Sequence, residues 1–80
     1  MEFQVDENAI YGVGVYYKGI KAYFSVLGAR YEKETDSLIC GDLDSCMIIE
    51  DFSRCNVKKT GDDEYEISTN NEINVALTQL

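Results

Sequence analysis

Hydrophobic side chains near the start of the chain follow the two-residue period of β-strands. Residues 9–17 and 20–27 are rich in aromatic and β-branched side chains, and Lys18-Gly19 separates them. Two such runs around a two-residue turn predict an antiparallel hairpin. If Tyr17 pairs with Ile20, one face of the hairpin is wholly apolar and is predicted to face the core. The pairs that continue this face are Val15–Ala22, Val13–Phe24 and Tyr11–Val26.

In the same register, Gly12 and Gly14 lie on the face turned away from the core. That face carries the pairs Tyr16–Lys21, Gly14–Tyr23, Gly12–Ser25 and Ile10–Leu27. The Tyr23 ring is therefore expected to cover the bare backbone at Gly14. A turn with Gly19 in the left-handed conformation, followed by a bulge, is an alternative that shifts the register by one residue. The glycines could also allow the sheet to coil into a small barrel, or let a partner approach the backbone.

The next segments carry weaker signals. The second strand is expected to continue to about Tyr31, the polar residues 32–36 to form a turn, and residues 37–40 a short strand. Residues 42–55 fit two structures. Asp42, Asp44 and Ser45 suit a helix start, yet the apolar side chains spread around the helical wheel, so a short buried strand at 46–49 fits equally well.

The last third returns to a clear strand pattern. Residues 56–60 and 64–68 flank Gly61-Asp62-Asp63 and predict a hairpin that pairs Val57 with Ile67 and Lys59 with Tyr65. After a turn, residues 72–77 alternate and place Ile73, Val75 and Leu77 inward. The 80 residues are thus expected to form a single domain, 1–80. Its fold class is β-rich (all-β or α+β): a small antiparallel meander sheet or partly closed barrel, with at most one or two short helices.

Charge is distributed unevenly along the chain. The net charge is −8, and all of it lies after Tyr31, because acidic and basic residues balance before that point. Such a field repels phosphate backbones and attracts basic surfaces, so direct nucleic-acid binding is not expected. The apolar content of 45% is that of a folded domain. No long apolar run predicts a membrane span, and the first ten residues resemble no secretory signal, so we expect a cytoplasmic protein.

The chain contains few residue types that carry chemistry. It has no histidine, which removes the commonest general base and the usual zinc and haem ligands. Its three cysteines form no C-x-x-C motif and are expected to be reduced, with one disulfide or a metal site as alternatives. Phosphate-binding glycine motifs and calcium-loop spacing are absent, although an acidic turn could hold a surface ion weakly. We therefore expect no catalytic residues, cofactor or bound metal.

Recognition of another protein is the function that this pattern favours. Carboxylates punctuate the turns of the acidic part, and tyrosines of the hairpin can anchor an interface. The predicted partner-binding residues are Tyr16, Tyr23, Tyr31, Asp42, Asp44, Glu50, Asp51, Asp62, Asp63, Glu64 and Glu66. The same carboxylates could instead keep a small sheet protein soluble, and the tyrosines could pack a second face.

The predicted function is that of a non-enzymatic acidic protein which inhibits a basic partner, a nuclease toxin or a nucleic-acid-binding defence complex, by masking its positive surface. By analogy alone, immunity proteins and phage-encoded inhibitors, some of which mimic DNA charge, act in this way. One alternative is a structural or assembly module that self-associates through strand edges, for example as a homodimer. A small enzyme or ligand-binding barrel is the other, and it would need a preformed pocket.

Overall fold

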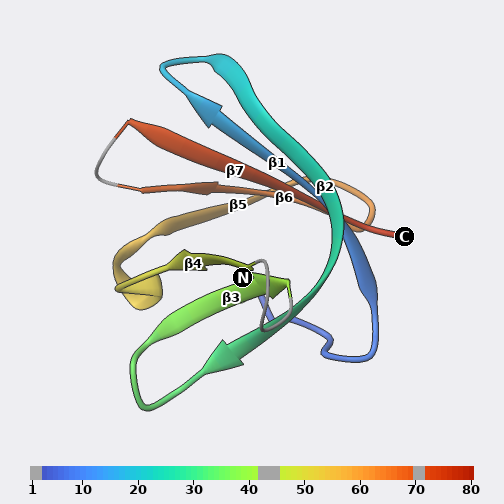
Figure 1. The fold of residues 1–80 in the computed structure, drawn as a ribbon, viewed down its shortest axis with the longest axis vertical. Coiled ribbons are helices and arrows are strands. Elements are labelled where there is room, and N and C mark those ends of the chain that lie inside the picture. The colour runs from blue at the N-terminus through green and yellow to red at the C-terminus, as the bar shows by residue number, and fades with distance from the viewer. Residues whose placement is uncertain (1–2, 42–45, 70–71) are drawn as a thin grey trace.

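Antiparallel strands account for most of the molecule. The computed structural model describes residues 3–41, 46–69 and 72–80, and Figure 1 shows their arrangement. The elements are β1 (Ile10–Tyr17), β2 (Ile20–Glu32), β3 (Ser37–Gly41), β4 (Cys46–Ile49), the 3₁₀ turn η1 (Phe52–Arg54), β5 (Asn56–Gly61), β6 (Glu64–Ser68) and β7 (Ile73–Gln79).

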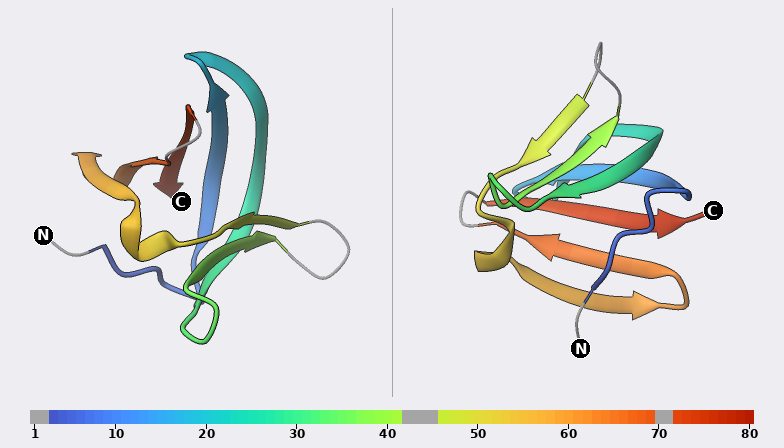
Figure 2. Two further views of the ribbon diagram at one scale, coloured as in Figure 1. Left: turned by 90° about the vertical axis from the view of Figure 1, so that its left-hand side faces the viewer. Right: turned by 90° about the horizontal axis from the view of Figure 1, so that it is seen from below.

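The strands form one sheet in the order β4-β3-β2-β1-β7-β6-β5, with every neighbouring pair antiparallel. The sheet is strongly curled and is not closed into a barrel. β2 is 13 residues long and belongs to two layers: its first part pairs with β1, and Ala29–Glu32 pair with β3. The bend of β2 places β3 and β4 across from β1, β7, β6 and β5 (Figure 2).

The core lies between these two layers. We call the sheet face turned toward it the inner face and the opposite one the outer face. Alternation along each strand decides which side chains are inward, because successive residues point to opposite faces. The buried apolar side chains are Tyr11, Val13, Ala29, Leu38, Cys40, Ile49, Ile67, Val75 and Leu77.

One end of the molecule is tied together across the layers by Asp36. The Asp36 carboxylate accepts hydrogen bonds from the Ser53 backbone N–H at 3.1 Å and from the Ser53 hydroxyl, and the Tyr31 hydroxyl donates to it at 2.7 Å. The Asp36 carbonyl also accepts the Phe52 N–H at 2.9 Å. The turn before β3 is thereby fixed to η1, which leads from β4 to β5.

The predicted fold class is confirmed, as is most of the strand pattern. The pairs Val57–Ile67 and Lys59–Tyr65 form as expected, and Val75 and Leu77 lie in the core. Within residues 42–55, the described part is strand β4 followed by η1, so a helix through residues 46–55 is wrong. The helix-capping residues Asp42 and Asp44 lie outside the described residues.

The predicted register of the first hairpin is correct only beside the turn. Lys18 and Gly19 have φ of 50° and 82°, as a two-residue hairpin turn with both central residues left-handed requires, and Tyr17 pairs with Ile20. A bulge then falls between Val15 and Tyr16, so that Val15 pairs with Tyr23 rather than with Ala22. All later pairs shift by one residue. A one-residue shift reverses the face of every following side chain.

Three predictions fail. Tyr17 and Ile20, placed on the face predicted to lie against the core, are 49% and 72% exposed at the hairpin tip. Phe24 and Val26, expected in the core, lie on the outer face with 58% and 53% of their surface exposed. Tyr23, expected opposite Gly14, lies opposite Val15. The glycines do face outward as predicted, and an aromatic ring does cover them, but the ring is that of Phe24: a Cβ on Gly12 would lie 3.6 Å from it.

Candidate protein-interaction surface

The outer face of the curled sheet carries an apolar ridge and an acidic ridge. Phe24 and Val26 on β2 form the apolar ridge, and Glu64 and Glu66 on β6 form the acidic one. The register places them in two rows across the sheet: Phe24, Gly14, Ala76, Glu66 and Val26, Gly12, Thr78, Glu64. Three strand spacings of about 4.8 Å separate the ridges, which gives about 14 Å along the sheet.

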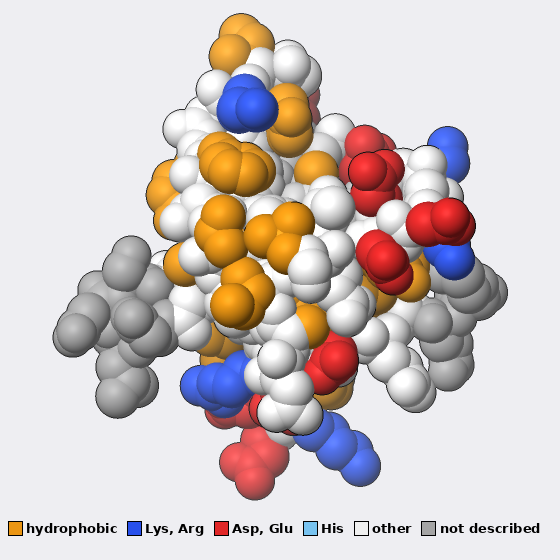
Figure 3. All heavy atoms as spheres, turned by 90° about the vertical axis from the view of Figure 1, so that its right-hand side faces the viewer, with side chains coloured by type: hydrophobic (Ala, Val, Ile, Leu, Met, Phe, Trp, Pro, Cys, Tyr) orange, Lys and Arg blue, Asp and Glu red, His pale blue; other side chains and the backbone are white. Residues whose placement is uncertain are grey.

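Small residues form the floor between the two ridges. Gly12, Gly14, Ala76 and Thr78 add little side-chain height, so the ridges stand above them. Figure 3 shows hydrophobic side chains gathered on this side of the molecule with acidic side chains beside them. Ile10, 54% exposed, extends the apolar area along β1. An exposed apolar area with a charged rim is the arrangement of a protein interface.

The acidic ridge is continued by the β5–β6 turn. Asp62 and Asp63 form this turn, and Asp63 has φ of 58°. The Asp63 carbonyl accepts a hydrogen bond of 2.8 Å from the Gln79 N–H, which joins the turn to β7. Four of the predicted carboxylates therefore lie together at one side of the outer face: Asp62, Asp63, Glu64 and Glu66. Lys58 is the cross-strand partner of Glu66 and partly offsets this charge.

Glu50 and Asp51 lie elsewhere. They follow β4 and precede η1, at the end of β5 opposite to the β5–β6 turn. β5 has six residues, so the two acidic groups are separated by about 20 Å. Asp42 and Asp44, also predicted as partner-binding residues, lie outside the described residues. Within the described residues, the structure thus divides the predicted acidic surface between two ends of one hairpin strand.

The three predicted tyrosines do not share a surface. Tyr16 is on the outer face, where its ring would lie 3.3 Å from a Cβ on Gly14. Tyr23 lies across from Val15 near the tip of the first hairpin and is 43% exposed. Tyr31 is at the far end of β2, packed against Phe52 with ring centroids 5.9 Å apart. Tyr16 alone belongs with the two ridges.

Hydrogen bonding at the Asp36 tie shifts the pKa values of its members. The bonds from Ser53 and Tyr31 hold the pKa of the Asp36 carboxyl below its ordinary value of 3.8, because they stabilise the anion. The same bond raises the pKa of Tyr31, since the neutral phenol is the donor. Asp36 therefore remains negative under ordinary conditions, but its charge serves the fold.

Two cavities flank η1. The larger, about 740 Å³, is lined by side chains that include Phe3, Tyr31, Asp36 and Phe52. Phe3 comes from the N-terminal segment and packs against Tyr65 with ring centroids 4.6 Å apart. The smaller cavity, about 350 Å³, lies beside β4. In the described part of the chain, no three Cys, Asp or Glu side chains gather as a metal site would require.

In the described segments of the chain, the two ion pairs use no predicted partner-binding carboxylate. Lys18 lies 3.6 Å from Glu72 near the tip of the first hairpin, and Arg30 lies 3.1 Å from Glu32 on β2. No helix in the described ranges has the length and apolar character needed to cross a membrane.

No family model, curated protein sequence or solved structure matches this chain. The functional assignment therefore has to come from the surface itself.

Sequence reasoning missed the apolar ridge. It assigned Phe24 and Val26 to the core because it carried one register through the whole hairpin. A signal was present further along β2. Leu27, Ala29 and Tyr31 occupy odd-numbered positions, and if these point inward, the even-numbered Phe24 and Val26 point outward.

Proposed function

We propose that this protein is a non-enzymatic binding protein that docks on a basic partner and masks the partner's positive surface. The observation that carries this proposal is the pair of ridges on one outer face, apolar at Phe24 and Val26 and acidic at Glu64 and Glu66. The apolar ridge supplies the desolvated centre of an interface. The acidic ridge selects a cationic partner and speeds its approach.

The partner class follows from charge. A net charge of −8 on a chain of 80 residues attracts surfaces that normally bind phosphate backbones. The partner would be a nuclease toxin or a nucleic-acid-binding defence complex, whose groove the protein fills with carboxylates in place of phosphates. This is the action of an immunity protein or a phage-encoded inhibitor. The free thiols of Cys40, Cys46 and Cys55 support a reducing compartment such as the cytoplasm.

The test is inhibition of a basic nuclease encoded beside the gene, measured across salt concentrations. Phe24→Ser removes the centre of the apolar ridge and is expected to raise Kd at least about tenfold, as loss of an aromatic anchor does. The double variant Glu64→Gln/Glu66→Gln is expected to raise Kd about fivefold, mainly through slower association. Glu34→Gln, which changes an exposed carboxylate in the β2–β3 turn, is the matched control and should have no effect. Tight inhibition whose Kd changes neither with salt concentration nor in the variants of the two ridges would contradict the proposal.

A second candidate is self-assembly through strand edges. The observation that favours it is the uncharged terminal strand β4, Cys46–Ile49, because an unguarded edge pairs readily with another chain. Light scattering separates the two candidates. A concentration-dependent homo-oligomer that binds no basic partner would favour assembly.

A further inference from the structure

β4 ends the sheet on one side and carries no charged side chain. Its backbone pairs with β3 through partners such as Ile39–Ile48 and Leu38–Ile49, and no other described strand pairs with it. Ile49 points inward and is 6% exposed, whereas Ile48 points outward and is 52% exposed. The free edge of such a strand presents backbone N–H and C=O groups that another extended chain can pair with.

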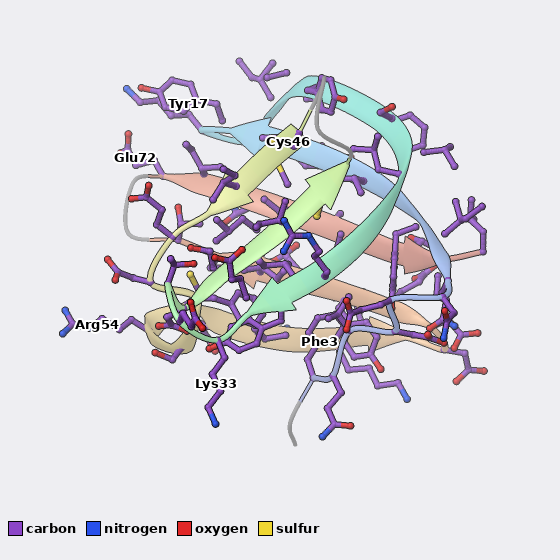
Figure 4. All side chains as sticks on the ribbon, turned by 60° about the horizontal axis from the view of Figure 1, so that its bottom comes forward. Phe3, Tyr17, Lys33, Cys46, Arg54 and Glu72 are labelled. Carbon is purple, nitrogen blue, oxygen red and sulfur yellow. The ribbon has the colours of Figure 1, made fainter. Side chains whose placement is uncertain are left out.

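A cavity of about 350 Å³ opens beside this strand. We call it the β4 slot. Its volume is at the low end of the range of about 300–1,000 Å³ typical of ligand pockets. Apolar residues from β1, β4 and β7 line it, and Glu50 and Asp51 follow at the end of β4. The apolar part consists of Val15, Met47, Ile48, Ile49, Cys55, Ile73 and Val75. Figure 4 shows β4 running from Cys46 toward η1 and Arg54.

An edge strand beside an apolar cavity matches the geometry of β-strand addition. In this mode the main chain of an extended peptide pairs with the edge, and its alternate side chains enter pockets along that edge. Backbone pairing supplies affinity, and the cavity supplies a preference for apolar side chains at every second position.

The charges around the slot decide the occupant. Among the described residues that line it, Glu50 and Asp51 are the charged ones, and both are acidic. A second copy of this chain would place only the uncharged strand Cys46–Ile49 beside these carboxylates, and the two chains, each of net charge −8, would repel each other. A peptide with lysine or arginine beside its apolar residues would instead form ion pairs with Glu50 and Asp51.

We infer that β4 and the β4 slot bind an extended polypeptide segment with apolar residues at alternate positions and a basic residue at its end. This site goes beyond the proposed function, because it lies on a different part of the molecule from the two ridges and can be tested without the partner. The added segment would become an eighth strand beside the seven of the sheet.

The experiment uses the whole protein and the peptide acetyl-Lys-Thr-Val-Thr-Val-Lys-amide as the probe. Backbone amide chemical shifts and hydrogen exchange are followed by NMR during titration. Binding should shift the amides of both Met47 and Ile48, should protect from exchange only those β4 amides whose N–H faces the free edge, and should shift Ile73 in the slot. A peptide N-methylated on alternate residues, which cannot complete the backbone pairing, should bind at least about tenfold more weakly, because several hydrogen bonds are lost.

Two variants with nearly equal exposure provide the control. Ile48→Lys places a guarding charge on the β4 edge and should abolish the shifts. Val26→Lys places the same charge on the outer face, where Val26 is 53% exposed, and should leave peptide binding unchanged. Val26→Lys should instead weaken docking of the basic partner, so failure of one site is distinguishable from failure of the other. The double variant Glu50→Gln/Asp51→Asn should weaken peptide binding about fivefold at low salt.

Shifts at β4 that vanish in Ile48→Lys and persist in Val26→Lys would establish the site. Absence of shifts at β4, or equal binding of the N-methylated peptide, would overturn it. Light scattering that shows a dimer dissociated by Ile48→Lys would also overturn it, because a second copy would then occupy the edge.

Discussion

The two terminal strands of the sheet, β4 and β5, each have an unpaired edge, but only one of them carries charged side chains. Each pairs with one neighbour and presents a free edge. β5 carries Lys58 and Lys59, and its alternation turns Lys58 to the outer face and Lys59 toward the inner one. Charges of this kind on an edge strand discourage pairing with another chain. β4, by contrast, consists of Cys46, Met47, Ile48 and Ile49 and has no such charge.

The difference teaches that edge protection here is selective. A sheet that only had to remain monomeric would gain by guarding both ends. This one guards the edge beside its acidic hairpin and leaves open the edge beside an apolar cavity. The open edge is thus a feature that can be tested against the guarded one.

The largest expected effect comes from the inward residues of the two edges. Ile49→Ala on β4 removes a side chain that is 6% exposed and should lower the free energy of unfolding by about 3 kcal/mol. Val57→Ala on β5 removes a half-buried side chain and should cost about 1 kcal/mol. Urea unfolding followed by circular dichroism measures both. Equal losses would mean that the two edges are packed equally well and would break the comparison.

The next effect concerns the Asp36 tie, which holds the η1 turn between the two edges. Asp36→Asn should lower the Tm by less than Ile49→Ala does, since Asp36 is near the surface. The folded-state pKa of Asp36 lies below 3.8, so its contribution to stability is full above that pH and is lost as the pH falls through the folded pKa. Thermal unfolding at pH 7 and at acid pH should therefore show a difference between wild type and variant that shrinks on acidification.

Glu34→Gln, in the same turn, is the matched control for this titration. It should follow the wild type at each pH. A gap between Asp36→Asn and the wild type that stays constant down to strongly acidic pH would show that the carboxylate charge of Asp36 contributes nothing to the tie.

A smaller effect is expected from removing the two lysines, Lys58 and Lys59, from the β5 edge strand. Lys58→Thr/Lys59→Thr should increase self-association in light scattering at high protein concentration, even though it makes the net charge more negative. Lys18→Asn/Lys33→Thr makes the same change of charge away from the edges and should remain monomeric; asparagine is used at Lys18 because that residue has φ of 50°. Association of both double variants to the same extent would point to a general effect of charge.

The smallest effect concerns thiol chemistry and leaves the fold intact. Cys46 on the β4 edge is exposed, whereas Cys40 on β3 is buried, and burial raises the pKa of Cys40 to about 11. Relative to its ordinary value of 9.0, this lowers the thiolate fraction about a hundredfold at pH 8. Mass spectrometry after brief alkylation of the native protein should find Cys46 modified and Cys40 unmodified. Early modification of Cys40 would show that β3 and β4 separate readily.

Features of this fold that depend on neighbouring residues could be predicted from sequence, and features that depend on distant residues could not. Local chemistry identified the Lys18-Gly19 turn, the pairs of the β5–β6 hairpin and the alternation of β7, because each depends on neighbouring residues. The bulge after the first hairpin turn was not predictable in this way. Its trace in the sequence lies further along β2, where Ala29 and Tyr31 pair with Cys40 and Leu38 and so fix which side chains of β2 point inward.

The candidate surface divides in the same manner. The carboxylates were identified from composition, but their separation into two ends of β5 required the topology. Phe24 and Val26 were assigned to the wrong face because the predicted register did not include the one-residue bulge. The bond between Asp36 and Ser53 joins residues 17 positions apart, and nothing in the local pattern of either residue signals the other.

The pairing of β1 with β7 has a consequence for how the chain acquires its structure during synthesis. β1 lies inside the sheet, yet one of its two neighbours is β7, which leaves the ribosome only after β2 to β6 have done so. Until β7 arrives, Tyr11, Val13 and Val15 lack half of their final surroundings, and the β5–β6 hairpin has no strand to attach it to the rest. Completion of the sheet around β1 must therefore wait for β7, and contacts between segments so distant in sequence form slowly. Nascent chains that stop before Ile73 would expose a second uncovered strand and be the forms most prone to aggregate.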